Sequence, residues 1–143
     1  MTKDERLIFE TEFWQVVLSS NQLYLGRCRV ELKRPCKDLS SLNQNEIVDF
    51  FDIVKKLESV LKSTFGATMF NWTCLMNNAY QDDTPKPQVH WHFRPRYKNR
   101  VDFAGQTFID TQFGGHYLRG DDDSTFASDE VLNLIKDEIK RNL

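Results

Sequence analysis

One segment of the sequence, residues 88–97, alternates so strictly that it fits an extended strand. Its even positions are polar or cationic, and its odd positions are apolar or aromatic. Successive side chains of a strand point to opposite faces. One face would therefore cover a core while the other carries a row of polar groups. Because Pro95 has no N–H to pair, pairing is expected to stop or bulge there.

The rest of the chain predicts an α+β fold. One helix separates the strands, and the eleven-residue loop before the alternating strand is too short for a helical crossover, so the sheet should be antiparallel. We expect a single domain spanning 1–143, with the C-terminal helix as an appendage. The expected elements are one or two strands over 7–18, strands over 26–33, over 67–76 and from about 88, and helices over 43–64 and 129–142, with 101–117 irregular.

Both helices carry signals at their ends. Ser41 and Gln44 match a capping box, and Gly66 stands where a left-handed C-cap belongs. Ser128 is the expected N-cap of the last helix. The apolar stripes predicted to face the core are Ile47, Phe50, Phe51, Val54, Leu57, Leu61 and Phe65 in the first helix, and Leu132, Ile135 and Ile139 in the last.

Composition and charge narrow the class of protein. The 19 Lys and Arg residues against 21 Asp and Glu give a net charge of −2, which would not hold the chain to nucleic acid. No apolar run approaches ~18 residues, and the charged N-terminus does not resemble a secretory signal, so no membrane segment is expected. Cys28, Cys36 and Cys74 lack a CxxC spacing and are expected to be reduced thiols of a cytoplasmic protein. The acidic run 121–123 is expected to be a solvated turn.

The polar face of the alternating segment carries the chemistry. His90 and His92 are two of the three histidines in the chain, and four cations follow them. Neighbouring side chains on one strand face lie about 6–7 Å apart, which suits two imidazoles addressing one phosphate chain. The cations would donate to phosphate oxygens and lower the pKa of the histidines. Neutral histidine is the form that can attack phosphorus as a nucleophile.

Three other interpretations of this segment stay open. It could be an edge strand whose polar face is solvated. The two histidines could chelate a metal ion with a third ligand from His116, Asp82, Asp83 or a cysteine, although nearby arginines oppose this and His116 also fits a plain loop histidine. The basic run could bind nucleic acid with Trp91 and Tyr97 stacking on bases, although Trp91 falls on the face opposite the cations.

The segment resembles the signature of the histidine-triad (HIT) superfamily, His-φ-His-φ-His-φ-φ with φ apolar, often followed by Pro-Arg. Matching on Pro95 and Arg96 places Gln88 at the first triad position, His90 at the second and His92 at the third. The Gln-Val-His-Trp-His variant looks like a bacterial-type subgroup of HIT family hydrolases. The resemblance covers most of the chain and implies an approximately five-stranded antiparallel sheet with one long helix and a C-terminal helix, often assembled as a homodimer.

The resemblance implies a nucleotide hydrolase or nucleotidyl transferase acting on nucleoside phosphoramidates or dinucleoside polyphosphates. His90 would attack the α-phosphorus to form a nucleotidyl-histidine, which water or an acceptor resolves. His92 would hydrogen-bond the α-phosphate and the bridging atom, while Gln88 can hold a hydrogen bond but cannot titrate. Asn77 would contact a phosphate, or else be a turn residue. No metal is built into such a site, although Mg²⁺ would arrive with a polyphosphate substrate.

Four further positions complete the predicted site for an AMP-like ligand. Thr84 keeps a hydroxyl for the leaving group, whereas Asp83 beside it would repel a polyphosphate and favour a smaller leaving group such as an amine. Arg94 and Arg96 would bind phosphate oxygens, or else be surface residues. Asn21 is the expected ribose-binding residue. The alternative to an enzyme is a catalytically weak nucleotide-binding module that retains the pocket.

Overall fold

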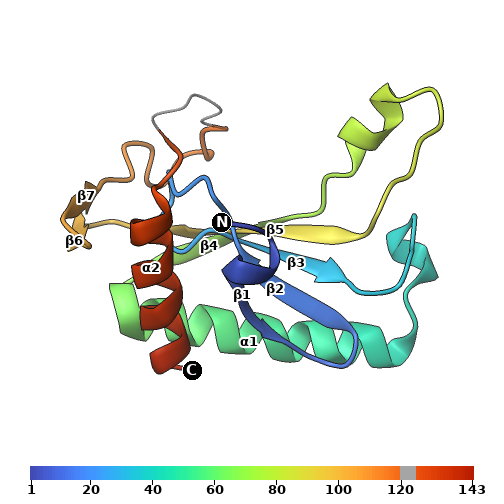
Figure 1. The fold of residues 1–143 in the computed structure, drawn as a ribbon, viewed down its shortest axis with the longest axis horizontal. Helices are drawn as coiled ribbons and strands as arrows, with labels where there is room; N and C mark the ends of the chain where they lie inside the picture. The colour runs from blue at the N-terminus through green and yellow to red at the C-terminus, as the bar shows by residue number, and fades with distance from the viewer. Residues whose placement is uncertain (120–124) are drawn as a thin grey trace.

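The computed structural model describes residues 1–119 and 125–143, and a five-stranded sheet lies at its centre (Figure 1). Every pair of neighbouring strands is antiparallel, in the order β1-β2-β3-β5-β4, which confirms the expected α+β sheet. The alternating segment forms β5, between β3 and β4. The solvated turn expected at 121–123 lies outside the described residues. The strands are β1 (Leu7–Glu10), β2 (Trp14–Leu18), β3 (Cys28–Leu32), β4 (Met69–Thr73) and β5 (His90–Arg96).

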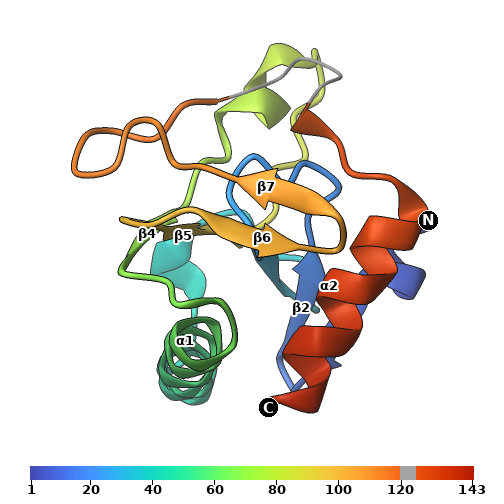
Figure 2. The same ribbon diagram turned by 90° about the vertical axis from the view of Figure 1, so that its left-hand side faces the viewer.

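Two helices and a small hairpin surround this sheet. The long helix α1 (Gln44–Phe65) covers one face, and α2 (Asp129–Arg141) packs beside β1 (Figures 1 and 2). The segment expected to be irregular contains the hairpin β6 (Val101–Phe103) and β7 (Gln106–Phe108). Its two-residue turn has positive φ at Ala104 and Gly105, a geometry that an Ala-Gly pair signals only weakly. The described residues also form the short 3-10 helices η1 (Asp4–Arg6), η2 (Leu39–Ser41) and η3 (Asn77–Gln81).

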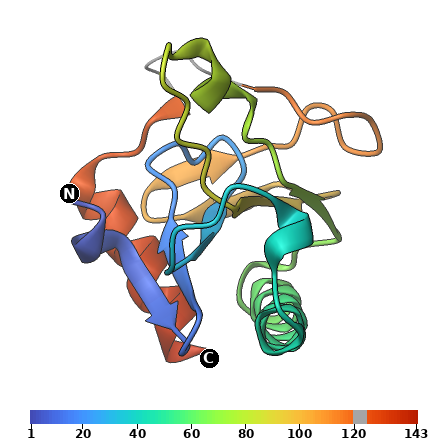
Figure 3. The same cartoon turned by 90° about the vertical axis from the view of Figure 1, so that its right-hand side faces the viewer.

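The loop before β5 departs from its expected form. It begins with η3, and η3 and the residues after it stand away from the sheet on the face opposite α1 (Figure 3). Neither of the two described α-helices is long and apolar enough to cross a membrane.

The caps of α1 differ from the prediction at one end. The capping box is formed by Asn43, whose Oδ1 accepts a hydrogen bond from the Glu46 N–H, while the Glu46 carboxylate accepts one from the Asn43 N–H. The predicted box at Ser41 was wrong because that residue ends η2, and the helix begins only after it. Gly66 adopts the left-handed C-cap as expected, and Ser128 caps α2.

The stripe that α1 buries is rotated from the predicted one. Ile47 and Phe51 were expected in the core, but they are 44% and 59% exposed. Ile53 and Val60 take their places, so the buried positions follow the helix period from a different starting residue. The buried side of α2 is as predicted, and it belongs to the same core as α1. The α2 side chains in that core are Val131, Leu132, Ile135 and Ile139.

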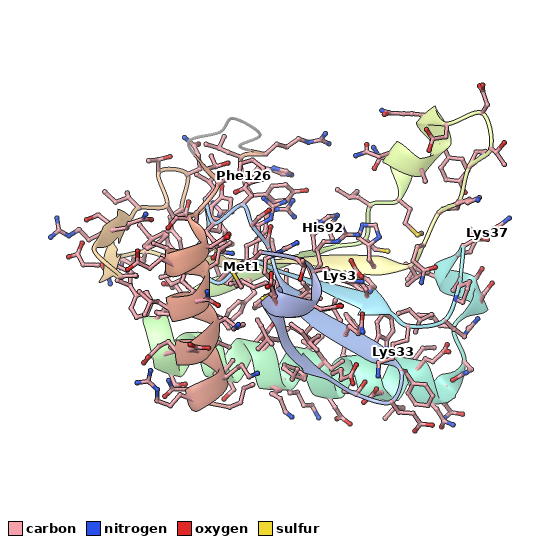
Figure 4. All side chains as sticks on the ribbon, viewed as in Figure 1. Met1, Lys3, Lys33, Lys37, His92 and Phe126 are labelled. Carbon is pink, nitrogen blue, oxygen red and sulfur yellow. The ribbon has the colours of Figure 1, made fainter. Side chains whose placement is uncertain are left out.

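The two faces of β5 separate as the alternation predicts. Trp91 stacks on Phe50 of α1 with ring centroids 4.9 Å apart. On the opposite face, His92 points away from α1 (Figure 4). Pairing of β5 with β4 continues through Pro95, contrary to expectation. On the other side of β5, pairing with β3 already ends at Phe93, which lies opposite Cys28. The missing N–H of the proline therefore faces no strand.

Candidate active site

The centre of the candidate site is the His90–His92 pair on the face of the sheet opposite α1. The position of β5 inside the sheet fixes their neighbours, since Arg29 of β3 and Thr73 of β4 both lie opposite His92. The Nε2 atoms of the two imidazoles are 3.2 Å apart, and the rings meet edge to face.

Hydrogen bonding assigns the tautomers of this pair. The Nδ1 atom of His90 lies 2.7 Å from the backbone carbonyl of Gln88, and a carbonyl can only accept, so Nδ1 carries the proton. The Nε2 atom of a neutral His90 is then a bare lone pair. His92 must donate its Nε2 proton to that lone pair, which leaves its own Nδ1 unprotonated, and this atom is buried without a partner. The atom of His90 that would attack phosphorus is therefore held on the solvent-facing side of the strand.

Both histidines are held neutral. Burial lowers the pKa of His90, and nearby Arg29 lowers it further, against the opposing effect of the hydrogen bond to the Gln88 carbonyl. Burial also lowers the pKa of His92 to about 3, with additional contributions from His90 and Arg94. The predicted direction is confirmed, but burial is the larger cause and the cations are the smaller one.

Three cavities meet at His92. A cavity of about 340 Å³ reaches from His92 past His90 to Lys86, and one of about 330 Å³ extends toward the turn after β2 and Phe126. A smaller cavity of about 140 Å³ lies toward Arg94. The first two together offer the room that a nucleotide and its leaving group need on either side of the reacting phosphorus.

Positive charge is concentrated around these cavities although the chain as a whole carries −2. Glu31 is the one carboxylate among the described residues that line them, and it pairs with Lys3 and Arg29. Such focusing favours an anionic ligand at the histidines. The cationic lining residues are Lys3, Arg6, Arg27, Arg29, Lys86, Arg94 and Arg119.

Sequence reasoning missed most of these cations. Arg27 and Arg29 belong to the alternating strand 26–33, but nothing in the sequence pairs that strand with the histidine strand. Lys86 and Arg119 come from loops, which leave no periodic signal.

The structure brings two of the predicted binding residues to the cavities. Asn77 lines the small cavity together with His92. Asn21 lines the cavity that contains Phe126, and its Oδ1 accepts a hydrogen bond from the Leu23 N–H. Thr84 is exposed and lines none of the three cavities, and the same holds for Asp83.

Gln88 contributes to the site through its backbone. Its side-chain oxygen accepts from the Cys36 N–H, and its amide donates to the carbonyls of Leu32 and Arg34. These bonds fasten the start of β5 to the chain that leaves β3. The Gln88 carbonyl is thereby positioned to hold the Nδ1 proton of His90.

The two arginines after the histidines have different environments. All five N–H groups of the Arg96 guanidinium are used, by the Asp110 carboxylate, the Asn71 side chain and the carbonyls of Gln112 and Gly115. Arg96 is 0% exposed and orders the loop that returns toward the site. Arg94 is 4% exposed but lines the small cavity.

The described residues include no group of three or more His, Cys, Asp or Glu side chains arranged to hold a metal ion. The residues suggested as a third ligand are dispersed, since Asp82, Asp83 and His116 are all exposed and outside the three cavities. Cys74 has a raised thiol pKa because it is partly buried.

Comparison with solved structures identifies the fold. No protein-family model matches the chain, and no curated protein matches it by sequence. Solved structures do match, and they define the fold as that of the histidine-triad proteins, which confirms the resemblance at the level of the fold.

The matching structures include a histidine triad protein from Sinorhizobium meliloti, with a TM-score of 0.72, 17% identity and coverage of 96% of this chain and 88% of that one. A diadenosine triphosphate hydrolase from Plasmodium falciparum matches with a TM-score of 0.62, 13% identity and coverage of 99% and 76%. A uridylyltransferase matches with a TM-score of 0.62, 18% identity and coverage of 96% and 41%.

Proposed function

We propose that this protein is a nucleotide-processing enzyme of histidine-triad type, which hydrolyses or transfers a nucleotidyl group through an intermediate on His90. The observation that carries the proposal is the hydrogen bond from Nδ1 of His90 to the Gln88 carbonyl. It leaves Nε2 of the same ring unprotonated beside cavities that are lined by cations. Two proteins with this fold, a diadenosine triphosphate hydrolase and a uridylyltransferase, support the same class of chemistry.

In the first step, the Nε2 lone pair of His90 forms an N–P bond to the α-phosphorus, and the bond from phosphorus to the leaving atom breaks with its electron pair. The Nε2–H of His92, which donates to His90 in the free protein, turns to donate a hydrogen bond to the leaving atom, and the leaving group takes its proton from water. The Nδ1–H of His90 keeps donating to the Gln88 carbonyl, and this hydrogen bond stabilises the positive ring of the intermediate.

In the second step, the oxygen of water or of an acceptor hydroxyl attacks the phosphorus and the N–P bond breaks. The electron pair returns to Nε2 of His90. The attacking oxygen loses its proton to water, and the Nε2–H of His92 returns to donate to Nε2 of His90. Arg29 lies opposite His92 in the register and can donate to the phosphate oxygens as charge develops on them.

The test uses adenosine phosphoramidate and diadenosine tetraphosphate with wild type, His90→Asn and a matched control, His116→Asn. Wild type and the His116 variant should release AMP, and His90→Asn should lose at least about a thousandfold in rate. Rapid quench into alkaline denaturant with radiolabelled substrate should trap a phosphoramidate adduct that maps to His90 and is lost on acid treatment. Because the pKa of His90 is lowered, kcat/KM should hold its neutral-pH value as the pH falls below 6.5.

Equal AMP release by wild type and His90→Asn would contradict the proposal. Binding of AMP without turnover of either substrate would establish the alternative, a nucleotide-binding module. Repeating the assay with EDTA and with added Mg²⁺ shows whether the tetraphosphate is used as its magnesium complex.

A further inference from the structure

Arg94 is a buried charge that has no carboxylate partner among the described residues. It is 4% exposed, and no carboxylate in the described parts of the chain lies within ion-pair distance of its guanidinium. Its Nη1 donates to the Thr73 hydroxyl, the group lies 4.0 Å from the centre of the Tyr117 ring, and its Nε–H is buried without a partner. Burying a cation in this way is costly unless an anion neutralises it.

Arg96, two residues along the same strand face, shows how the chain treats a buried guanidinium that has only a structural role. Its Nε donates to Asp110 at 2.6 Å, and every other N–H has an acceptor from the protein. Arg94 lacks this set of acceptors. The contrast indicates that Arg94 can take an anionic partner that none of the described residues supplies.

The space for such a partner lies beside Arg94. The cavity of about 140 Å³ is lined by Arg27, Arg94 and Arg119, by the Asn77 and Asn78 side chains and by His92. None of the described residues that line it is a carboxylate. The guanidinium groups of Arg94 and Arg119 and the two amides are a donor set that suits phosphate oxygens. The HIT signature has an apolar residue at the position of Arg94, so this charge is a feature of this chain and not of the pattern.

We propose that this cavity binds a second phosphate group of the substrate, distinct from the phosphate that His90 attacks. The proposal rests on the proposed function, since it assigns the substrate class of the same site. His92 and Arg94 are next neighbours on one strand face, about 6–7 Å apart, so one molecule can reach both. The second phosphate belongs either to the leaving group or to the ribose of the nucleotide.

The test is isothermal titration calorimetry in the His90→Asn background, where no ligand is consumed. The ligands are AMP, ADP, adenosine 3′,5′-bisphosphate and inorganic pyrophosphate. The variants are Arg94→Leu, Arg94→Lys and, as the matched control, Arg100→Leu, which removes an exposed arginine outside the cavities. A ligand with a second phosphate should bind at least about tenfold more tightly than AMP.

Arg94→Leu should abolish that advantage, so that AMP and the ligand with a second phosphate bind to it equally well. Arg94→Lys should keep part of the advantage, and Arg100→Leu should keep all of it. An advantage of ADP assigns the second phosphate to the leaving group, and an advantage of the bisphosphate assigns it to the ribose. A urea unfolding curve for Arg94→Leu checks that the variant is folded.

The proposal is overturned if neither ligand with a second phosphate binds more tightly than AMP, or if Arg94→Leu weakens all ligands equally. If AMP does not bind, the titration with pyrophosphate tests the cavity separately from the nucleotide. Pyrophosphate binding that depends on Arg94 supports the phosphate cavity and counts against an AMP-like ligand, whereas its absence overturns the cavity as well.

Discussion

The neutral state of His92 has a measurable effect on stability. The pKa of this imidazole is about 3 in the folded protein, because it is buried beside His90 and Arg94. In the unfolded chain it should return to about 6.5. Between these values the unfolded state binds a proton that the folded state does not, so the free energy of unfolding falls as the pH drops below 6.5, and the loss is complete near pH 3.

The size of the effect follows from the shift. A full shift from 6.5 to 3 would remove about 2.7 kcal/mol of the free energy of unfolding at pH 4.5 relative to pH 7 or above. His92 is only partly buried and lines open cavities, so solvent screening reduces this to about 1–2 kcal/mol. Carboxylates elsewhere in the chain also titrate over this range, and a difference between variants cancels their contribution.

The assay is urea unfolding at pH 7 and pH 4.5 for wild type, His92→Gln and His116→Gln. Glutamine carries no titrating group, so the loss of stability on acidification should be about 1–2 kcal/mol smaller for His92→Gln than for wild type. His116 is exposed and outside the cavities, and its variant should follow wild type. If His92→Gln and wild type lose the same free energy between the two pH values, the reasoning about the buried neutral imidazole is refuted.

Five substitutions test the fold by urea unfolding. Asp110→Asn removes the charge that neutralises a fully buried guanidinium and should cost about 3–5 kcal/mol; a loss below about 1 kcal/mol would contradict this. Asn43→Ala should lower the free energy of unfolding by about 1 kcal/mol through loss of the α1 cap, and Ser41→Ala by less than about 0.5 kcal/mol. Equal losses would indicate that Ser41 contributes to the cap, as predicted from sequence. Gly26→Ala should be clearly worse than Gly66→Ala, because both have positive φ but a Cβ at Gly26 would clash with α1, whereas none would at Gly66.

Local patterns in the sequence were sufficient for the elements and for the central histidine pair. The alternation over 88–97 placed His90 and His92 on one face of a strand because side-chain direction along a strand has a period of two residues. The C-cap at Gly66 and the N-cap of α2 were predictable because a cap depends on a few neighbouring residues. Where local signals competed, as at the start of α1, a nearby capping residue took precedence over the predicted one.

The environment of the histidines was decided by the tertiary structure alone. The cations Arg27, Arg29, Lys86 and Arg119 come from β3 and from loops, and only strand order and loop paths bring them to His92. The different environments of Arg94 and Arg96 were also decided by the tertiary structure. Both lie on the face that the sequence predicts, but whether a carboxylate reaches a guanidinium depends on contacts between segments far apart in the chain. Periodicity reports direction along one element, whereas charge compensation depends on what the rest of the chain packs against it.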